Sequence, residues 1–209
     1  MLSGSTTATK LLCIPAVISP STTDTPTDPS AGRPPAQRTC QTGTMDHASV
    51  AASSIPPVRT GPRNPGDAWV EGDRGRFWGR FGAAGVLAWD PARGVLLQHR
   101  AVWSHNGGTW GLPGGALHEG EDAVSGALRE AHEEAAVPAG HVDVLFTSVL
   151  DLGYWSYTTV VVKVREPFEP VISDPESIEL LWVPLPEVAD KELHPGFGAA
   201  WPNLRERLA

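Results

Sequence analysis

The chain has 209 residues, of which 41% are hydrophobic and 19% charged, and its formal net charge is −8. This acidic balance argues against a protein that holds a nucleic-acid backbone through a basic patch. No apolar run is long enough to span a membrane as a helix.

Residues 1–66 differ in composition from the rest of the chain. They contain no Glu and no aromatic residue, whereas Ser, Thr, Pro and Gly are abundant. Such a segment buries too little apolar surface to offset the entropy lost on ordering. We therefore predict a disordered tail over residues 1–66 and one folded domain over residues 67–209, with net charges of +2 and −10.

Both cysteines, Cys13 and Cys40, lie in the predicted tail, so the domain has no disulfide framework and no Cys-based metal site. This is compatible with a reducing cytoplasm, which is the location we expect. Two alternatives stay open. The apolar run at residues 11–18 resembles a weak signal peptide, although Pro15 interrupts it, and translation could begin at Met45.

The hydrophobic pattern of the domain predicts strands before and after a central helix. The predicted strands cover residues 81–89, 94–100, 142–150, 154–164 and 178–183, with a short strand and turn at 110–115. One helix is expected at residues 122–136, and another at 199–208 after the helix-breaking Pro195 and Gly196. This order predicts an α/β sandwich around a mixed sheet.

The helix at residues 122–136 has an apolar stripe and an acidic face. The stripe has three- and four-residue spacing and consists of Val124, Ala127, Leu128, Ala131 and Ala135. Glu130, Glu133 and Glu134 lie together on another side of the helix and repel one another. A divalent cation that prefers oxygen ligands, such as Mg²⁺ or Mn²⁺, would remove this repulsion. A solvated acidic face is the alternative interpretation of the three glutamates alone.

The flanking residues extend the glutamates into a long motif. Gly115 is followed after five residues by Glu121, and after seven more by Arg129-Glu130-Ala131-x-Glu133-Glu134-x-Ala136-Val137. This motif resembles the Nudix box of MutT-like hydrolases, and eight of its nine specified positions match. The segment at residues 110–114 is similar to the usual lead-in. Ala136 is the exception, because the family has glycine there.

The resemblance implies a Nudix-type α/β/α sandwich and the hydrolysis of a diphosphate linkage in a nucleotide-like substrate. It implies a Mg²⁺ cofactor, for which Mn²⁺ could substitute. Glu130, Glu133 and Glu134 match the glutamates that bind metal, and the carbonyl of Gly115 matches a backbone ligand.

Two further positions of the motif have structural roles in the family. Arg129 matches the arginine that pairs with the glutamate at the Glu121 position, which ties the loop to the helix. Ala136 replaces a glycine that allows a left-handed backbone, so we expect a slightly altered exit from the helix.

A general base must take the proton of the attacking water. Glu176 is the candidate, because its place before a strand resembles that of the catalytic glutamate in MutT-like members. Its nearby competitors are Glu166, Asp174 and Glu179. If none of these is the base, Glu134 or Glu130 of the box could serve.

Substrate recognition is less well specified by the sequence. Arg100 could reach a phosphate, and aromatic residues could stack on a base: Trp103, Tyr154, Trp155 and Tyr157. A surface role for Arg100 and core roles for the aromatics are the alternatives. His105, His118 and His132 have no zinc-site spacing, so we assign them no metal.

The leading functional hypothesis is a hydrolase that converts a (deoxy)nucleoside triphosphate to the monophosphate and pyrophosphate. A hydrolase of nucleotide sugars or dinucleoside polyphosphates is the first alternative. A non-catalytic, nucleotide-sensing regulatory module is the alternative from another class. We expect no nucleic-acid or membrane partner, and a homodimer stays open.

Overall fold

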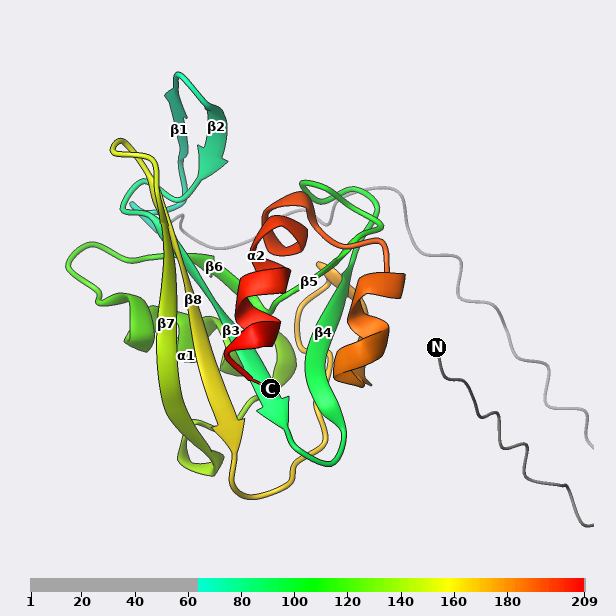
Figure 1. Cartoon of the computed structure of the whole chain (residues 1–209). Coiled ribbons are helices and arrows are strands. Elements are labelled where there is room, and N and C mark those ends of the chain that lie inside the picture. Colours follow the sequence, from blue (N-terminus) through cyan, green and yellow to red (C-terminus); the bar gives the residue numbers. More distant parts are fainter. Residues whose placement is uncertain (1–63, 209) are drawn as a thin grey trace, which may run out of the picture. The chain divides into compact units, whose positions relative to one another are not determined.

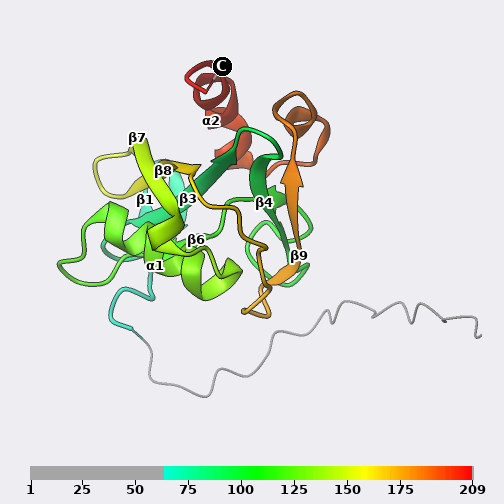
Figure 2. The same cartoon turned by 90° about the horizontal axis from the view of Figure 1, so that it is seen from below.

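A computed structural model of the chain describes residues 64–208. The predicted disordered tail over residues 1–66 lies outside these residues, apart from its last three positions. The described chain forms a seven-stranded mixed sheet with one α-helix on each face, as Figure 1 and Figure 2 show from two directions. This arrangement confirms the predicted α/β/α sandwich.

Most strands of the sheet agree with the apolar runs in the sequence. They are β3 (Ala83–Asp90), β4 (Gly94–Arg100), β5 (Trp110–Gly111), β6 (Gly114–Ala116), β7 (Val142–Asp151), β8 (Ser156–Val164) and β9 (Ser177–Val183). Strands β3 and β8 are parallel, and the other pairings within the sheet are antiparallel. Two short 3₁₀ helices, η1 (Ala139–His141) and η2 (Leu185–Asp190), connect elements of the sandwich.

The two central strands separate as they leave their connecting turn. Strand β3 pairs with β4 only at its last two residues, Trp89 and Asp90. Farther from the turn, β3 pairs with β6, whereas β4 pairs with β5 and β9. The segment from β5 through β6 therefore runs from β4 across to β3, and it places Gly115 opposite Ala84 of β3.

Alternate residues of the central strands face opposite helices, as the period of a β-strand requires. Val86, Val160 and Val162 pack with the alanine stripe of α1 (Ala123–Ala135) on one face. Leu87 and Val161 pack with α2 (Pro195–Glu206) on the other face. The central strands are thus buried on both sides, which explains their continuous apolar runs.

Helix α1 has well-defined ends. Asp122 caps its N-terminus, because one carboxylate oxygen accepts the backbone N–H groups of Val124 and Ser125, each at 3.0 Å. At the other end, Ala136 has φ 53° and ψ 31°. The expected change in the helix exit is therefore not seen, because Ala136 itself adopts the left-handed conformation that glycine favours.

Replacing Ala136 by glycine will stabilise the protein, because the left-handed conformation costs an alanine about 1 kcal/mol. Part of this gain is lost to the greater freedom of glycine in the unfolded chain. We expect a rise of about 2 °C in Tm, measured by thermal unfolding. The matched control is Ala123→Gly in the first turn of α1, which will lower Tm. A lower Tm for Ala136→Gly would contradict this account.

Helix α2 begins four residues earlier than predicted. The sequence predicts helix breakers at Pro195 and Gly196, but these are the first two residues of α2. Proline is tolerated at the first helical position because its missing N–H would have no partner there. His194 caps the helix, and its Nδ1 accepts the backbone N–H of Gly196 at 3.2 Å.

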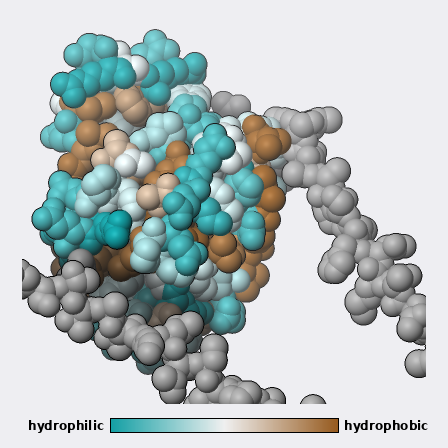
Figure 3. All heavy atoms as spheres, turned by 45° about the vertical axis from the view of Figure 1, so that its right-hand side comes forward, coloured by the Kyte–Doolittle hydropathy of each residue, from teal (hydrophilic) through white to brown (hydrophobic). Residues whose placement is uncertain are grey.

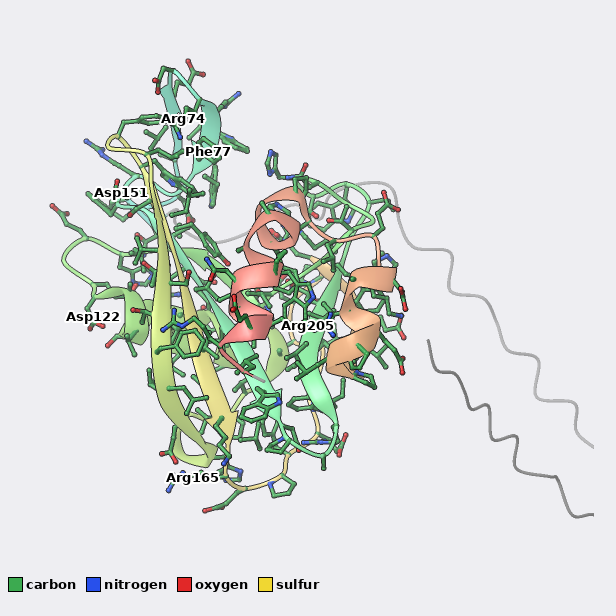
Figure 4. All side chains as sticks on the ribbon, viewed as in Figure 1. Arg74, Phe77, Asp122, Asp151, Arg165 and Arg205 are labelled. Atoms are coloured by element: carbon green, nitrogen blue, oxygen red, sulfur yellow. The ribbon has the colours of Figure 1, made fainter. Side chains whose placement is uncertain are left out.

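A hairpin that the sequence did not predict precedes the sheet. Its strands are β1 (Trp69–Gly72) and β2 (Gly75–Trp78), which project at the top of Figure 1. Figure 4 marks Arg74 and Phe77 on this hairpin. In Figure 3 its tip is mostly hydrophilic, and hydrophobic residues gather beneath it. The apolar side chains of the hairpin therefore lie next to the rest of the domain.

The loop between β7 and β8 holds this hairpin in place. The Tyr154 hydroxyl donates to the carbonyl of Gly75 at 3.3 Å, and Trp155 Nε1 donates to the carbonyl of Trp78 at 3.0 Å. The rings of Phe77 and Trp155 are stacked, with centroids 4.4 Å apart. Elements about 80 residues apart in the chain therefore form one wall. No helix among residues 64–208 is long and apolar enough to cross a membrane.

Candidate active site

The acidic face of α1 points toward the segment at β6. Glu134 Oε2 accepts the backbone N–H of Gly114 at 2.9 Å. Gly115 lies directly against Glu130, since a Cβ at this glycine would be 2.6 Å from Glu130 Oε2. A larger residue at position 115 would displace the Glu130 carboxylate, so the backbone of Gly115 and this carboxylate face the same small space.

Glu134 is the most deeply buried acidic group of the site, with 8% of its surface exposed. Its Oε2 also lies 3.3 Å from Nε2 of Gln98, which donates its second N–H to Ser177 Oγ at 2.7 Å. Burial raises the pKa of Glu134 to about 8, and the N–H of Gly114 opposes this shift. A cation beside Glu134 would favour its ionised form.

Arg129 forms ion pairs with the remaining carboxylates of the motif. It forms a two-pronged ion pair with Glu121, in which Nε and Nη2 each donate to a different carboxylate oxygen at 2.9 Å. Its Nη2 also donates to the carbonyl of Ala116 at 3.2 Å. Hydrogen bonding from Arg129 lowers the pKa of Glu121 to about 2. The structure thus brings together the two residues that the motif pairs, and the pair links the loop to α1.

The remaining two box glutamates also contact Arg129. Its Nη1 donates to Glu130 Oε1 at 2.7 Å and to Glu133 Oε2 at 3.3 Å. Burial raises the pKa of Glu130, and the hydrogen bond from Arg129 opposes the shift. Glu133 is the exposed member, with 58% of its side chain accessible. Arg129 therefore offsets part of the repulsion within the acidic face.

The donor set fits a hard divalent cation. Over residues 64–208, each box glutamate keeps one oxygen that accepts no hydrogen bond: Oε2 of Glu130, Oε1 of Glu133 and Oε1 of Glu134. No three His, Cys, Asp or Glu side chains in this range are arranged to hold an ion by themselves. Mg²⁺ usually binds one or two carboxylates and completes its shell with water and phosphate oxygens, so these free oxygens suit it.

A cavity of about 1220 Å³ opens beside the box. Its wall includes Gly114 and Gly115, parts of the β1–β2 hairpin, the loop after β4 and the first turn of α2. Pockets for small ligands usually have volumes of about 300–1,000 Å³. The cavity is therefore large enough for a nucleotide, and one side of it reaches Gly114 and Gly115, which contact the box glutamates.

Arg100 and Glu176 both line this cavity. Arg100 Nη2 lies 3.9 Å from Glu176 Oε2, and its Nε donates to the carbonyl of His105 at 3.2 Å. The charge of Arg100 also acts on the pKa values of Glu134 and His194. An anionic group in this cavity would therefore meet a guanidinium in its wall.

The NUDIX domain family profile matches residues 79–203, which is more than half of the chain. The chain belongs to the Nudix family. The family match, together with relatives that have the names of diphosphatases and hydrolases, confirms a pyrophosphohydrolase that acts on nucleotide-like substrates. The predicted family resemblance and enzyme class are therefore correct.

Three similar proteins support this assignment. A Mycobacterium tuberculosis protein with the name putative 8-oxo-dGTP diphosphatase 3 is 48% identical over 154 residues, covering 68% of this chain and 70% of that protein. A nucleoside triphosphate pyrophosphatase/Nudix hydrolase fusion protein from Bifidobacterium longum is 42% identical over 166 residues, covering 75% of this chain but 34% of the fusion protein. The crystal structure of RenU, a Nudix hydrolase from M. smegmatis, matches with a TM-score of 0.62 and 49% identity, covering 68% of this chain and 95% of that chain.

The aromatic candidates for substrate binding in this Nudix domain fall into two groups. Trp103, Trp155 and Tyr157 line the cavity, as the sequence suggested. Tyr154 does not line it, because its ring lies against Gly72 and its hydroxyl bonds to Gly75. The structure therefore gives Tyr154 a role in holding the hairpin and brings the other three to the cavity wall.

The competitors of Glu176 for the role of base lie in different places. Glu166 contacts His141 at 3.5 Å and is exposed, and Glu179 is exposed on β9. Asp174 accepts the backbone N–H of Glu176 at 2.6 Å. Among these acidic residues, only Glu176 is part of the cavity wall.

Sequence reasoning missed Gln98 and Ser177 as supports of the Nudix glutamates. Gln98 is fully buried in β4 on the same face as Leu96, and it joins Glu134 to Ser177. The signal was a glutamine at the end of the apolar run Val95-Leu96-Leu97, in line with the buried Leu96. Such a residue needs buried partners for its amide, and these can belong to a functional site.

Proposed function

We propose that this Nudix enzyme hydrolyses a (deoxy)nucleoside triphosphate to the monophosphate and pyrophosphate with Mg²⁺ as cofactor. The observation that carries this proposal is the single cavity that joins the box at Gly115, the cation of Arg100 and an aromatic wall. The diphosphatase name of the M. tuberculosis relative, which refers to a deoxynucleoside triphosphate, also supports it.

Glu130, Glu133, Glu134 and the carbonyl of Gly115 would hold the metal. Their oxygens are the hard ligands that Mg²⁺ prefers, and Mn²⁺ accepts the same donors. The chemistry supplied by a bound cation is neutralisation of phosphate charge and stabilisation of the leaving phosphate. In an acidic domain this neutralisation also overcomes the repulsion between the protein and a polyphosphate.

Arg100 would bind a phosphate of the substrate, because its guanidinium lies in the wall of the cavity that also contains Gly114 and Gly115. Its carboxylate neighbour Glu176, at 3.9 Å, is too distant for a close hydrogen bond from this atom. A phosphate could therefore engage the guanidinium while Glu176 remains beside it. Trp155 forms part of the wall along which the nucleoside would lie.

Glu176 would act as general base. Its carboxylate takes a proton from water while the water oxygen forms a bond to phosphorus, and the bond from that phosphorus to the bridging oxygen breaks. The bridging oxygen leaves with the departing phosphate group. If Glu176 does not serve, Glu134 or Glu130 is the alternative base.

Replacing Glu176 by glutamine will lower kcat by about 10²–10⁴-fold, because the amide cannot accept the proton. KM should change by less than about threefold, since the amide keeps the shape of the side chain. Steady-state kinetics with Mg²⁺ checks both values. Glu179→Gln on β9 is the matched control and should leave kcat unchanged. A normal kcat for Glu176→Gln would assign the proton to a box glutamate.

Two alternatives remain behind the leading proposal. The first is cleavage of nucleotide sugars or dinucleoside polyphosphates, and the second is a non-catalytic, nucleotide-sensing module. A non-catalytic sensor would not need the complete set of carboxylates that this chain retains. The cytoplasmic location and a homodimer stay predictions.

The substrate class is tested by kinetics on a panel. The purified full chain is assayed with Mg²⁺ against nucleoside and deoxynucleoside triphosphates, nucleotide sugars and dinucleoside polyphosphates. The proposal expects the highest kcat/KM for a triphosphate. A higher kcat/KM for a nucleotide sugar or a dinucleoside polyphosphate would replace it.

A further inference from the structure

Gln98 places a polar amide in the apolar interior of the sheet. The residue is fully buried in β4 and is not part of the cavity wall. Its Nε2 donates one N–H to Ser177 Oγ at 2.7 Å and the other to Glu134 Oε2 at 3.3 Å. Its Oε1 is buried and has no hydrogen-bond partner among residues 64–208. Gln98 therefore reaches the active site only through Glu134 and Ser177.

The burial of this amide is unfavourable for folding. A buried acceptor without a partner lowers the free energy of unfolding, whereas a methionine of similar length would fill the space without this cost. The two residues before Gln98, Leu96 and Leu97, are fully buried and apolar. Packing therefore does not explain a glutamine at this position, but its hydrogen bond to Glu134 does.

The two carboxylate oxygens of Glu134 have different surroundings. Oε2 accepts the backbone N–H of Gly114 at 2.9 Å and the amide N–H of Gln98 at 3.3 Å. Within the described chain, Oε1 accepts no hydrogen bond. Two donors on the same oxygen restrict the rotation of the carboxylate, so the oxygen that remains for a cation is Oε1.

The segment before β9 contacts the same glutamate at its main chain. The backbone N–H of Ser173 donates to the carbonyl of Glu134 at 3.1 Å. Four residues later, Ser177 accepts the amide N–H of Gln98. Glu176 lies between these two serines in sequence. The main chain and the side chain of Glu134 are thus both connected to the segment that contains Glu176.

We propose that Gln98 is a positioning residue for the metal ligand Glu134. Its amide, which Ser177 orients, keeps Oε2 of Glu134 occupied, so that the carboxylate binds a divalent cation through Oε1 in a fixed direction. Mg²⁺ requires nearly octahedral geometry, so a misdirected ligand weakens its binding. Removing the hydrogen-bond partner of a metal ligand typically lowers metal affinity or activity by about 10–100-fold. This inference rests on the proposed function, because it assumes the metal role of Glu134.

Replacing Gln98 by methionine in the full chain tests this role. Methionine keeps the length of the side chain and removes both N–H donors. The binding of Mn²⁺ is measured without substrate, from the electron paramagnetic resonance signal of the free ion. We expect the Kd for Mn²⁺ to rise about tenfold or more. Tm should stay within about 3 °C of the wild-type value, because loss of the unpaired carbonyl offsets the two lost hydrogen bonds. An unchanged Kd would overturn the inference.

Kinetics with a triphosphate separate positioning from general damage to the protein. The Mg²⁺ concentration for half-maximal rate should rise about tenfold or more in Gln98→Met. KM for the triphosphate should change by less than about threefold, since Gln98 is outside the cavity wall. A rise in this KM as large as the rise in the Mg²⁺ requirement would overturn the inference, because it would show a distorted cavity.

The matched control is Leu97→Met, which introduces the same side chain at the neighbouring buried position of β4. Leu97 packs with the cluster on the α2 side of the sheet, away from Glu134. The exchange of leucine for methionine is well tolerated in protein cores, so the Kd for Mn²⁺ and the Mg²⁺ requirement should not change. Equal effects of Leu97→Met and Gln98→Met would overturn the inference, because repacking of β4 would then be the cause.

Ser177→Ala tests the same contacts from their other end, including the case in which Gln98→Met does not fold. Alanine removes the acceptor that orients the amide, so the Kd for Mn²⁺ should rise about threefold or more. The double variant with Gln98→Met should bind Mn²⁺ no more weakly than Gln98→Met alone, because both changes interrupt the same hydrogen-bonded chain. An unchanged Kd in Ser177→Ala, or additive losses in the double variant, would overturn the inference.

The Mn²⁺ measurement also separates this inference from the proposed function. Binding that weakens in Gln98→Met supports the positioning role even if no triphosphate is hydrolysed. Equal binding by the wild-type protein and Gln98→Met, together with turnover of a triphosphate, overturns the positioning role alone. If Mn²⁺ does not bind, or binds equally well when Glu133 and Glu134 are both glutamine, the metal role of Glu134 is wrong and the two proposals fall together.

Discussion

Replacing Glu133 and Glu134 together by glutamine will lower Mg²⁺-dependent turnover by about 10³-fold or more. The loss follows because amides are poor ligands for Mg²⁺, and removal of metal stabilisation costs several kcal/mol in the transition state. At 1.36 kcal/mol for each factor of ten, about 4 kcal/mol corresponds to this change. Steady-state kinetics of the full-length double variant with saturating Mg²⁺ checks it.

The stability of the same variant distinguishes a metal role from a folding role. Glutamine at position 134 still accepts the N–H of Gly114, and the replacement removes the cost of burying a carboxylate. We therefore expect a Tm equal to or above that of the wild-type protein. The control is Glu119→Gln, an exposed carboxylate in the loop before α1, which should keep full turnover. Retained Mg²⁺-dependent turnover in the double variant would show that the site assignment is wrong.

Replacing Arg129 by methionine will destabilise the protein by about 3 kcal/mol. The change leaves Glu121 largely buried without its cation, and it removes the shared neighbour of Glu130 and Glu133. Removing one partner of a buried pair costs about 3–5 kcal/mol, and the partial exposure of this pair places the effect near the lower limit. Thermal unfolding should show a Tm lower by about 6–12 °C.

The ion pair between Arg129 and Glu121 also makes the free energy of unfolding depend on pH. The pKa of Glu121 falls from 4.5 to about 2 in the folded state, so its contribution is complete above pH 4.5 and disappears as the pH falls toward 2. The difference in Tm between the wild-type protein and Arg129→Met should therefore shrink over this range.

A double variant checks that the unpaired carboxylate causes the loss. Adding Glu121→Gln to Arg129→Met removes the uncompensated charge, so the double variant should be more stable than Arg129→Met alone. Additive losses from the two changes would contradict the ion-pair account.

Local patterns in the sequence were sufficient for the elements that position the box. The alanine stripe of α1 and the apolar runs of β3 and β8 predicted a buried helix and two central strands, since each pattern repeats with the period of its element. The box spacing placed Glu121 near Arg129, which the ion pair between them shows directly. These features depend on residues within about 20 positions of one another.

Features built from distant segments could not be predicted in this way. The β1–β2 hairpin is held by Tyr154 and Trp155, about 80 residues later, and most of its own residues are exposed. The contact between Asn106 and His194 needs the start of α2, which the sequence predicts four residues too late because proline is typical of a helix break. The cavity wall is formed by such distant segments, and this explains why the sequence specified the reaction better than the substrate.

The most direct test of the account is product analysis with one triphosphate. The purified full chain is incubated with dGTP, with and without Mg²⁺, and the products are separated by chromatography. We expect dGMP and pyrophosphate in equal amounts, and only when Mg²⁺ is present. Formation of dGDP with inorganic phosphate, or hydrolysis that continues when EDTA removes the metal, would contradict it.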